Sequence, residues 1–317
     1  MFEYSLRRFF GTFLVIIGIL AIAFFILYLL PGNPAETLAG PRADPDTIKR
    51  ISREMGIDLP IHQRFSRYIV KIMKGDLGRS VINNKPVLAS IIEKFPYTLK
   101  LSILAMVFSI FSGLLAGIFG ALHRGSAADR ICTVFSVLGI SVPIFLTGIL
   151  FLYIFAGKLR IFPTSAYGKE GSLMIFILPA LTLGIRSGAF LARIVRSSLT
   201  EVLNHDYIRT ARAKGLSKWR ILTKHALLNA LIPIITVVGL DLSSFLNGSV
   251  IVETIFDIPG LGRFAMDAIL KRDYPVIQGI VLFSAIIFVL MNFFVDLIYA
   301  WVNPKIREEI SGGRVGG

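Results

Sequence analysis

The chain has 317 residues, of which 54% are hydrophobic and 17% charged, and its mean hydropathy is +0.71. This composition is typical of an integral membrane protein and argues against a soluble two-domain enzyme. The formal net charge of +14 would suit a nucleic-acid-binding protein, but the basic residues are spread over loops between apolar runs. They form no continuous face with interleaved aromatic residues, so no nucleic acid is expected as a partner.

Six apolar runs are each long enough to cross a bilayer as a helix, which takes about 20 residues. The first, 9–30, has 22 residues without a charge, and a cleaved signal peptide is its alternative interpretation. The others cover about 99–121, 132–156, 174–196, 231–252 and 277–301. We therefore predict an all-α, polytopic membrane protein with six transmembrane helices.

The long connection 31–98 carries helix signals of its own. Asp44-Pro45 begins one expected helix, Pro60 begins a second that Gly75 ends, and a third begins near Pro86. The sequence GDLGRS at 75–80 superficially resembles a phosphate-binding loop, but it lacks a GK[ST] ending and a preceding strand, so a turn is expected. The connection is predicted to form a small external helical region.

The distribution of Lys and Arg predicts the orientation. Fourteen of them lie at the N-terminus, in 122–130, in 196–230 and after Trp301, against six in 157–173 and 253–276. The positive-inside rule then places both termini and the loop 197–230 in the cytoplasm; the loop 31–98 is too long for the rule to apply. The predicted organisation is a cytoplasmic N-terminus and first span at 1–30, the external region at 31–98, a five-span core at 99–303, and a cytoplasmic tail at 304–317.

The polar stretch 204–233, NHDYIRTARAKGLSKWRILTKHALLNALIP, predicts a helix, a break and a second helix. Asn204 or Asp206 can cap the first helix, Gly215 supplies a left-handed stop, and Ser217 can cap the second. Apolar residues fall on one side of the first helix and basic residues on much of the rest. A solvated basic loop lying on lipid headgroups is the alternative interpretation.

This stretch resembles the cytoplasmic EAA loop of ABC-importer permeases, in the form of the B-type subunit of dipeptide, oligopeptide and nickel transporters. Ala211, Gly215 and Leu227 match the general pattern, while Arg209, Thr210, His225 and Leu228 depart from it. The resemblance is carried further by four sequence segments: DYIRTARAKGLS, HALLNALIP, ETIFDIPGLGR (253–263) and RDYPVIQG (272–279). It extends from Leu6 to about Arg307. In that family the loop is a coupling helix that docks into the ATPase, which implies a coupling role for Tyr207, Ala211, Lys214, Gly215, Leu216 and Ser217.

The resemblance implies a permease subunit of an ATP-driven importer for peptides or a related solute, in the inner membrane of a bacterium or archaeon. Its implied partners are a homologous second permease in a heterodimer, two ABC ATPases, an external solute-binding protein and membrane lipid. The chain has no GxxxxGK[ST], GxSxG, HExxH or CxxC motif, so no enzyme, metal site or cofactor is expected in it, and ATP and Mg would bind to the ATPases. An ion-coupled secondary transporter is the alternative, as is a nickel or glutathione permease within the family.

Two charges, Arg186 and Asp241, lie nearest the middle of expected spans. They fall at similar depth, and an unpaired charge there costs about 2.5–3.5 kcal/mol, so each needs a partner or a water-filled path. They are expected either to form a structural pair or to line the solute pathway. In the second case the Arg would hold a peptide carboxylate and the Asp an amino group.

Overall fold

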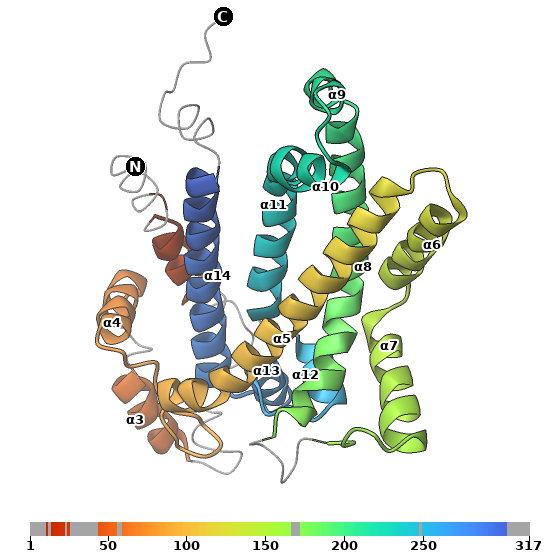
Figure 1. The fold of residues 1–317 in the computed structure, drawn as a ribbon. Coiled ribbons are helices and arrows are strands. Elements are labelled where there is room, and N and C mark those ends of the chain that lie inside the picture. The colour runs from red at the N-terminus through yellow and green to blue at the C-terminus, as the bar shows by residue number, and fades with distance from the viewer. Residues whose placement is uncertain are drawn as a thin grey trace, which may run out of the picture.

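The computed structural model describes residues 11, 14–22, 24–25, 44–55, 59–165, 172–246 and 249–302. This part of the chain is helical, and its only β-type pairing is an isolated bridge between Arg79 and Pro86. The α-helices (Figure 1) are α3 (Pro45–Met55), α4 (Ile61–Met73), α5 (Val87–Leu122), α6 (Ala127–Ser141), α7 (Ile144–Phe151), α8 (Met174–Leu203), α9 (Asp206–Ala213), α10 (Lys218–Arg220), α11 (Leu227–Leu246), α12 (Val250–Ile255), α13 (Leu261–Leu270) and α14 (Tyr274–Val302). Two π-helical turns, η1 (Leu152–Lys158) and η2 (Ile221–Ala226), follow α7 and precede α11.

Four of the expected spans are single helices long and apolar enough to cross a membrane. They are Val87–Leu122, Met174–Leu203, Lys218–Leu246 and Tyr274–Val295. The span expected at 132–156 is instead a pair, Ala127–Ser141 and Ile144–Lys158, bent by 101°. Pro143 is the N-cap of α7, and a proline there has no amide hydrogen to continue the helix from α6. The first expected span, 9–30, is described only in part, at residues 11, 14–22 and 24–25, so the count of six is not established.

The third short helix expected near Pro86 is not a separate element. It forms the first turns of α5, which has 36 residues and continues through Pro96 past the expected boundary at 98. Val87 and Ile91 are fully buried against residues of α13 and α14, and this packing holds the first turns of α5 in place. In contrast, α3 and α4 begin as the sequence predicts, and Gly75 adopts a φ of +74°.

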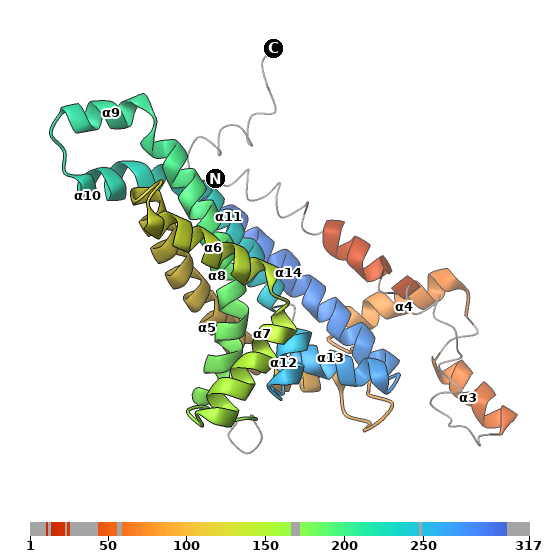
Figure 2. The ribbon, with the colours of Figure 1, turned by 90° about the vertical axis from the view of Figure 1, so that its right-hand side faces the viewer.

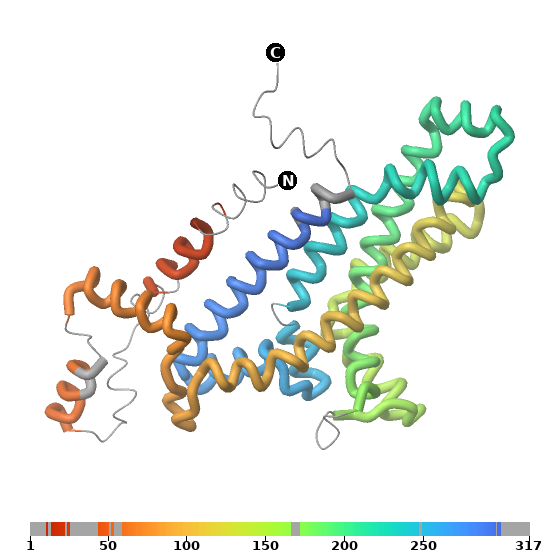
Figure 3. Tube along the Cα trace, turned by 60° about the vertical axis from the view of Figure 1, so that its left-hand side comes forward, coloured from red at the N-terminus to blue at the C-terminus, as the bar shows by residue number. Residues whose placement is uncertain are grey.

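The centre of the fold is the contact between α5 and α8, which cross along much of their length (Figure 3). Glycines let the two backbones approach closely. A Cβ at Gly117 would lie 2.7 Å from the carbonyl oxygen of Ala192, and one at Gly184 would lie 2.8 Å from that of Ala105. Small residues at such spacing are how membrane helices pack without a hydrophobic driving force between them.

The connections gather at two opposite ends of the bundle. Helices α9 and α10 project from one end, and α12 and α13 lie at the other (Figure 2). Helix α4 lies beside that second end, near the start of α14, and α3 lies farther out from the bundle (Figure 2). The stretch predicted to face the cytoplasm and the region predicted to be external are therefore far apart.

Candidate functional site

The segment from α9 to η2 folds as a helical hairpin around one small apolar cluster. Ile208 and Ala211 of α9 are buried against Ile221 of η2. Between the helices, Gly215 has a φ of +77°, and an added Cβ would meet no atom within 4 Å. The requirement for glycine is therefore conformational, as the sequence predicts, since side chains are disfavoured at positive φ.

The capping prediction is right at one end of this hairpin and wrong at the other. The hydroxyl of Ser217 accepts a hydrogen bond from the Arg220 amide at 3.4 Å, as expected for an N-cap. Neither Asn204 nor Asp206 caps α9, whose N-cap is His205 with no side-chain bond. Asn204 instead ends α8, because its backbone amide bonds back to the last turn of that helix.

The outer surface of the hairpin is basic and carries exposed aromatic side chains. Lys214, Gly215 and Ser217 are exposed, while Leu216 packs partly against the apolar cluster. Tyr207 is 43% exposed, and its hydroxyl accepts a hydrogen bond from Asn229 Nδ2 at 3.1 Å. Trp219 is 73% exposed. The sequence-based prediction gave this residue no role, although tryptophan is enriched among the residues that dominate protein interfaces.

Helices α8 and α11, which precede and follow the hairpin in the chain, anchor it in the bundle. Residues of α8 near its end, Leu199 and Val202, are buried against Leu222 and Ala226 of η2. A bidentate ion pair joins α8 to α6, because Arg196 Nε and Nη2 donate to Asp129 Oδ1 and Oδ2 at 2.5 and 2.9 Å. The hairpin is therefore joined to the core at both of its ends.

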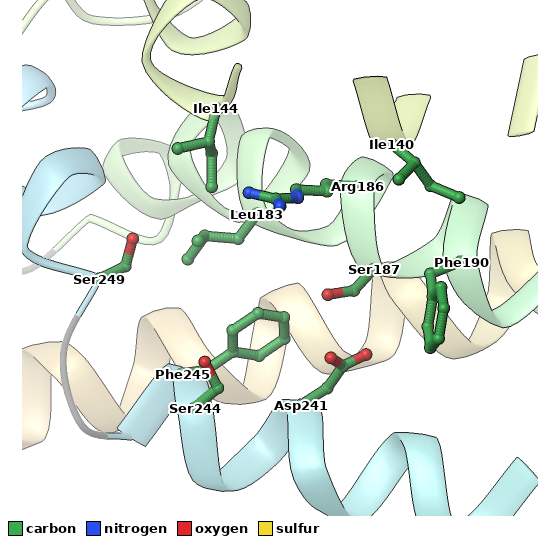
Figure 4. Close-up of a pocket in the computed structure, with 10 residues that line it drawn as sticks. All are labelled: Ile140, Ile144, Leu183, Arg186, Ser187, Phe190, Asp241, Ser244, Phe245 and Ser249. Carbon is green, nitrogen blue, oxygen red and sulfur yellow. The ribbon is translucent and has the colours of Figure 1, made fainter. Parts of the chain in front are cut away.

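A cavity of about 550 Å³ lies between α6, α7, α8 and α11 (Figure 4). Both of the intramembrane charges singled out from the sequence, Arg186 and Asp241, line it. No ion pair joins them among the described residues. Asp241 Oδ2 is buried and accepts no hydrogen bond within that same part of the chain. Between the two charges lies Ser187, and Phe190 and Phe245 supply apolar walls (Figure 4).

At the opposite end of the bundle, a buried carboxylate organises the turn before α13. Glu253 is fully buried, and its carboxylate accepts hydrogen bonds from Thr98 Oγ1 at 2.8 Å and from the Arg263 amide at 3.0 Å. Thr98 Oγ1 in turn accepts from the Leu261 amide at 2.8 Å. A Cβ at Gly260 would lie 2.6 Å from this carboxylate. The glycines of ETIFDIPGLGR thus leave room for an acidic group at the N-terminus of a helix, where it is favourable.

A second carboxylate fixes the GDLGRS stretch. Asp273 is buried and accepts from the Ser80 hydroxyl at 2.5 Å and from the Val81 amide at 3.2 Å. Gly78 has a φ of +82° and lies against Pro275. The stretch is therefore a turn packed on the start of α14, as predicted. No group of three or more potential metal ligands occurs within the described ranges.

Comparison with known proteins gives consistent matches. Residues 113–308 match the family "Binding-protein-dependent transport system inner membrane component", and residues 1–102 match the N-terminal domain of such membrane components. The glutathione transport system permease protein GsiC of Salmonella paratyphi A is 41% identical over 309 residues, covering 98% of this chain and 100% of that protein. GsiC of Escherichia coli K12 is 40% identical over the same coverage.

A solved structure shares the fold. The inward-facing MetNI methionine ABC transporter superposes on this chain with a TM-score of 0.57 at 18% sequence identity. The match covers 67% of this chain and 96% of the other.

Proposed function

The chain belongs to the family of binding-protein-dependent transport system inner membrane components, and from this premise we propose that it imports short peptides or a peptide-like solute such as glutathione. The observation that carries the proposal is the match to the GsiC proteins along nearly the whole of both chains. Those relatives are named as glutathione permeases. Methionine is the solute named for the MetNI transporter, which shares only the fold with this chain.

The chain is the membrane permease subunit of an ABC importer and is not an enzyme. Such a subunit lies in the inner membrane and works with ATPase subunits and a substrate-binding protein. ATP and Mg²⁺ are assigned to the ATPases. A homologous second permease completes the proposed assembly as a heterodimer, so that the solute crosses between two permeases.

The hairpin from α9 to η2 is the proposed contact with an ATPase. Tyr207, Lys214, Gly215 and Ser217 are exposed on it, and the left-handed conformation of Gly215 joins its two helices. Ala211 and Leu216 act from inside, because they pack in the apolar cluster that joins its two helices. The exposed Trp219 supplies a large apolar group of the kind that dominates protein interfaces.

The proposed orientation has this hairpin and both termini in the cytoplasm. The excess of Lys and Arg on that side supports it, together with the position of α12 and α13 at the opposite end of the bundle (Figure 2). The region around α3 and α4 would then face outward, where a solute-binding protein docks.

The test is uptake into proteoliposomes that contain this chain with its partner permease and ATPases. Internal ATP and an external loaded binding protein should give accumulation of a labelled tripeptide, and removal of either should abolish it. Uptake that needs an ion gradient but neither ATP nor ATPases would refute the proposal in favour of a secondary transporter.

A further inference from the structure

The cavity between α6, α7, α8 and α11 holds two opposite charges that do not neutralise each other. Arg186 lies about 18 Å along α8 from Met174, at a rise of 1.5 Å per residue. That places it near the middle of a hydrocarbon core about 30 Å thick. Asp241 reaches the same cavity from α11. An ionised group at that depth is costly without a partner or water.

Two charged groups of the cavity remain available to a ligand: the Arg186 guanidinium and one oxygen of the Asp241 carboxylate. Arg186 is exposed and has no carboxylate within ion-pair distance among the described residues. One oxygen of Asp241 is buried without a hydrogen-bond donor in the described part of the chain. Most buried polar atoms in folded proteins have a partner, so an unpaired carboxylate oxygen facing a cavity needs an explanation. A ligand that brings a cation to Asp241 and an anion to Arg186 would supply both missing partners.

We propose that this cavity is a solute-binding site for a short zwitterionic peptide, with Arg186 binding a carboxylate and Asp241 binding an ammonium group. This rests on the proposed function as a peptide permease. An arginine guanidinium binds a carboxylate through two parallel hydrogen bonds, and a carboxylate accepts the hydrogen bonds of an ammonium group.

The remaining lining fits the same ligand class. The hydroxyl of Ser244 is a hydrogen-bonding group for a peptide amide, while the Ser187 side chain interacts with the Asp241 carboxylate and helps to position it. The rings of Phe190 and Phe245 form apolar walls for a side chain (Figure 4). Apolar walls with a few convergent polar groups are characteristic of small-molecule sites. The volume of about 550 Å³ lies inside the range of roughly 300–1,000 Å³ for such sites. It suits a peptide of a few residues and not a long chain.

Blocked peptides separate the two charges. Uptake of three tripeptides is compared: one with free termini, one N-acetylated and one C-amidated. For Arg186→Gln, uptake of the free and N-acetylated peptides should fall about tenfold to a hundredfold, the value of a hydrogen bond to a charged group. Uptake of the C-amidated peptide should change far less, because the carboxylate that Arg186 binds is already absent. Asp241→Asn should give the converse pattern.

The comparison is built so that other selectivity cancels. Each uptake is divided by the wild-type value for the same peptide, which removes the preference of the binding protein. Arg193→Gln, two turns along α8, and Asp267→Asn, on the surface of α13, are matched controls that should leave all three ratios near one. Equal loss for all three peptides in Arg186→Gln, or no loss for any, would overturn the proposal.

A direct measurement needs neither ATP nor a binding protein. In a Cys132→Ser background, Ser244→Cys places a thiol in the cavity, and a water-soluble maleimide reports its accessibility. A tripeptide with free termini should slow labelling at least tenfold, and adding Arg186→Gln should abolish that protection. Labelling that no peptide slows would exclude the site. Protection in a protein that shows no ATP-dependent uptake would retain the site and reject the proposed function.

Discussion

The buried carboxylate of Glu253 allows a stability prediction that follows from its contacts. Replacing it with alanine removes acceptors for Thr98 Oγ1 and for the Arg263 amide. Each hydrogen bond to a charged group contributes about 1.5–3 kcal/mol, so Glu253→Ala should lower the free energy of unfolding by about 3–6 kcal/mol. Glu253→Gln keeps the volume and one acceptor oxygen, but its amide nitrogen cannot accept the other hydrogen bond. The loss should therefore be smaller, about 1–3 kcal/mol.

The assay is equilibrium unfolding of the purified chain in mixed micelles with a denaturing detergent. Glu93→Ala is the matched control, because the Glu93 side chain is 60% exposed on the same α5 helix that carries Thr98. Its effect should stay within about 0.5 kcal/mol. If Glu253→Ala costs no more than this control, the carboxylate does not hold α12, α13 and α5 together, and the reasoning is wrong.

Two further predictions concern the hairpin and the orientation. Gly215 has a φ of +77°, so Gly215→Val should cost about 1 kcal/mol or more in local geometry and abolish ATP-driven uptake while the protein still inserts. The control is Gly125→Val, at a φ of +80° in another turn, which should keep uptake. Equal uptake by both variants would contradict the coupling role. In a Cys132→Ser background, a cysteine at Lys49 should react with an impermeant thiol reagent from outside and one at Lys218 only from inside. The reverse labelling pattern would invert the topology.

Local features of the fold could be predicted from the sequence because single residues determine them. Pro45 and Pro60 mark the starts of α3 and α4, since a proline fits the beginning of a helix and disrupts its interior. Gly75 and Gly215 occupy positive φ at the predicted stops, and Ser217 caps as predicted. Each of these signals acts within a few residues, so no knowledge of the rest of the chain is needed.

Features that depend on distant contacts could not be predicted. Thr98 and Glu253 are 155 residues apart in sequence, and only the packing of α5 against α12 and α13 brings them together. The continuity of α5 through Pro96 likewise depends on contacts with α13 and α14. Counting residues along the expected spans placed Arg186 and Asp241 at a similar depth. The count gave no information on whether their side chains would meet or face a cavity between them.

The proposed coupling hairpin and the proposed solute site share the same two helices. Helix α8 runs without a break from Arg186 to Leu203, about 26 Å at 1.5 Å per residue, and reaches α9 after two residues. At the other end of the hairpin, η2 leads directly into α11, which carries Asp241.

A force on the hairpin therefore acts on both α8 and α11, and any motion of one helix against the other changes the distance between Arg186 and Asp241. The π-helical turn η2 lies at the junction of the hairpin with α11, and such turns recur at functional sites. Both helices are held by close glycine contacts, α8 against α5 and α11 against α14, where a Cβ at Gly239 would lie 2.6 Å from Val295. We propose that ATPase movement alters the affinity for solute by changing the distance of Asp241 from Arg186.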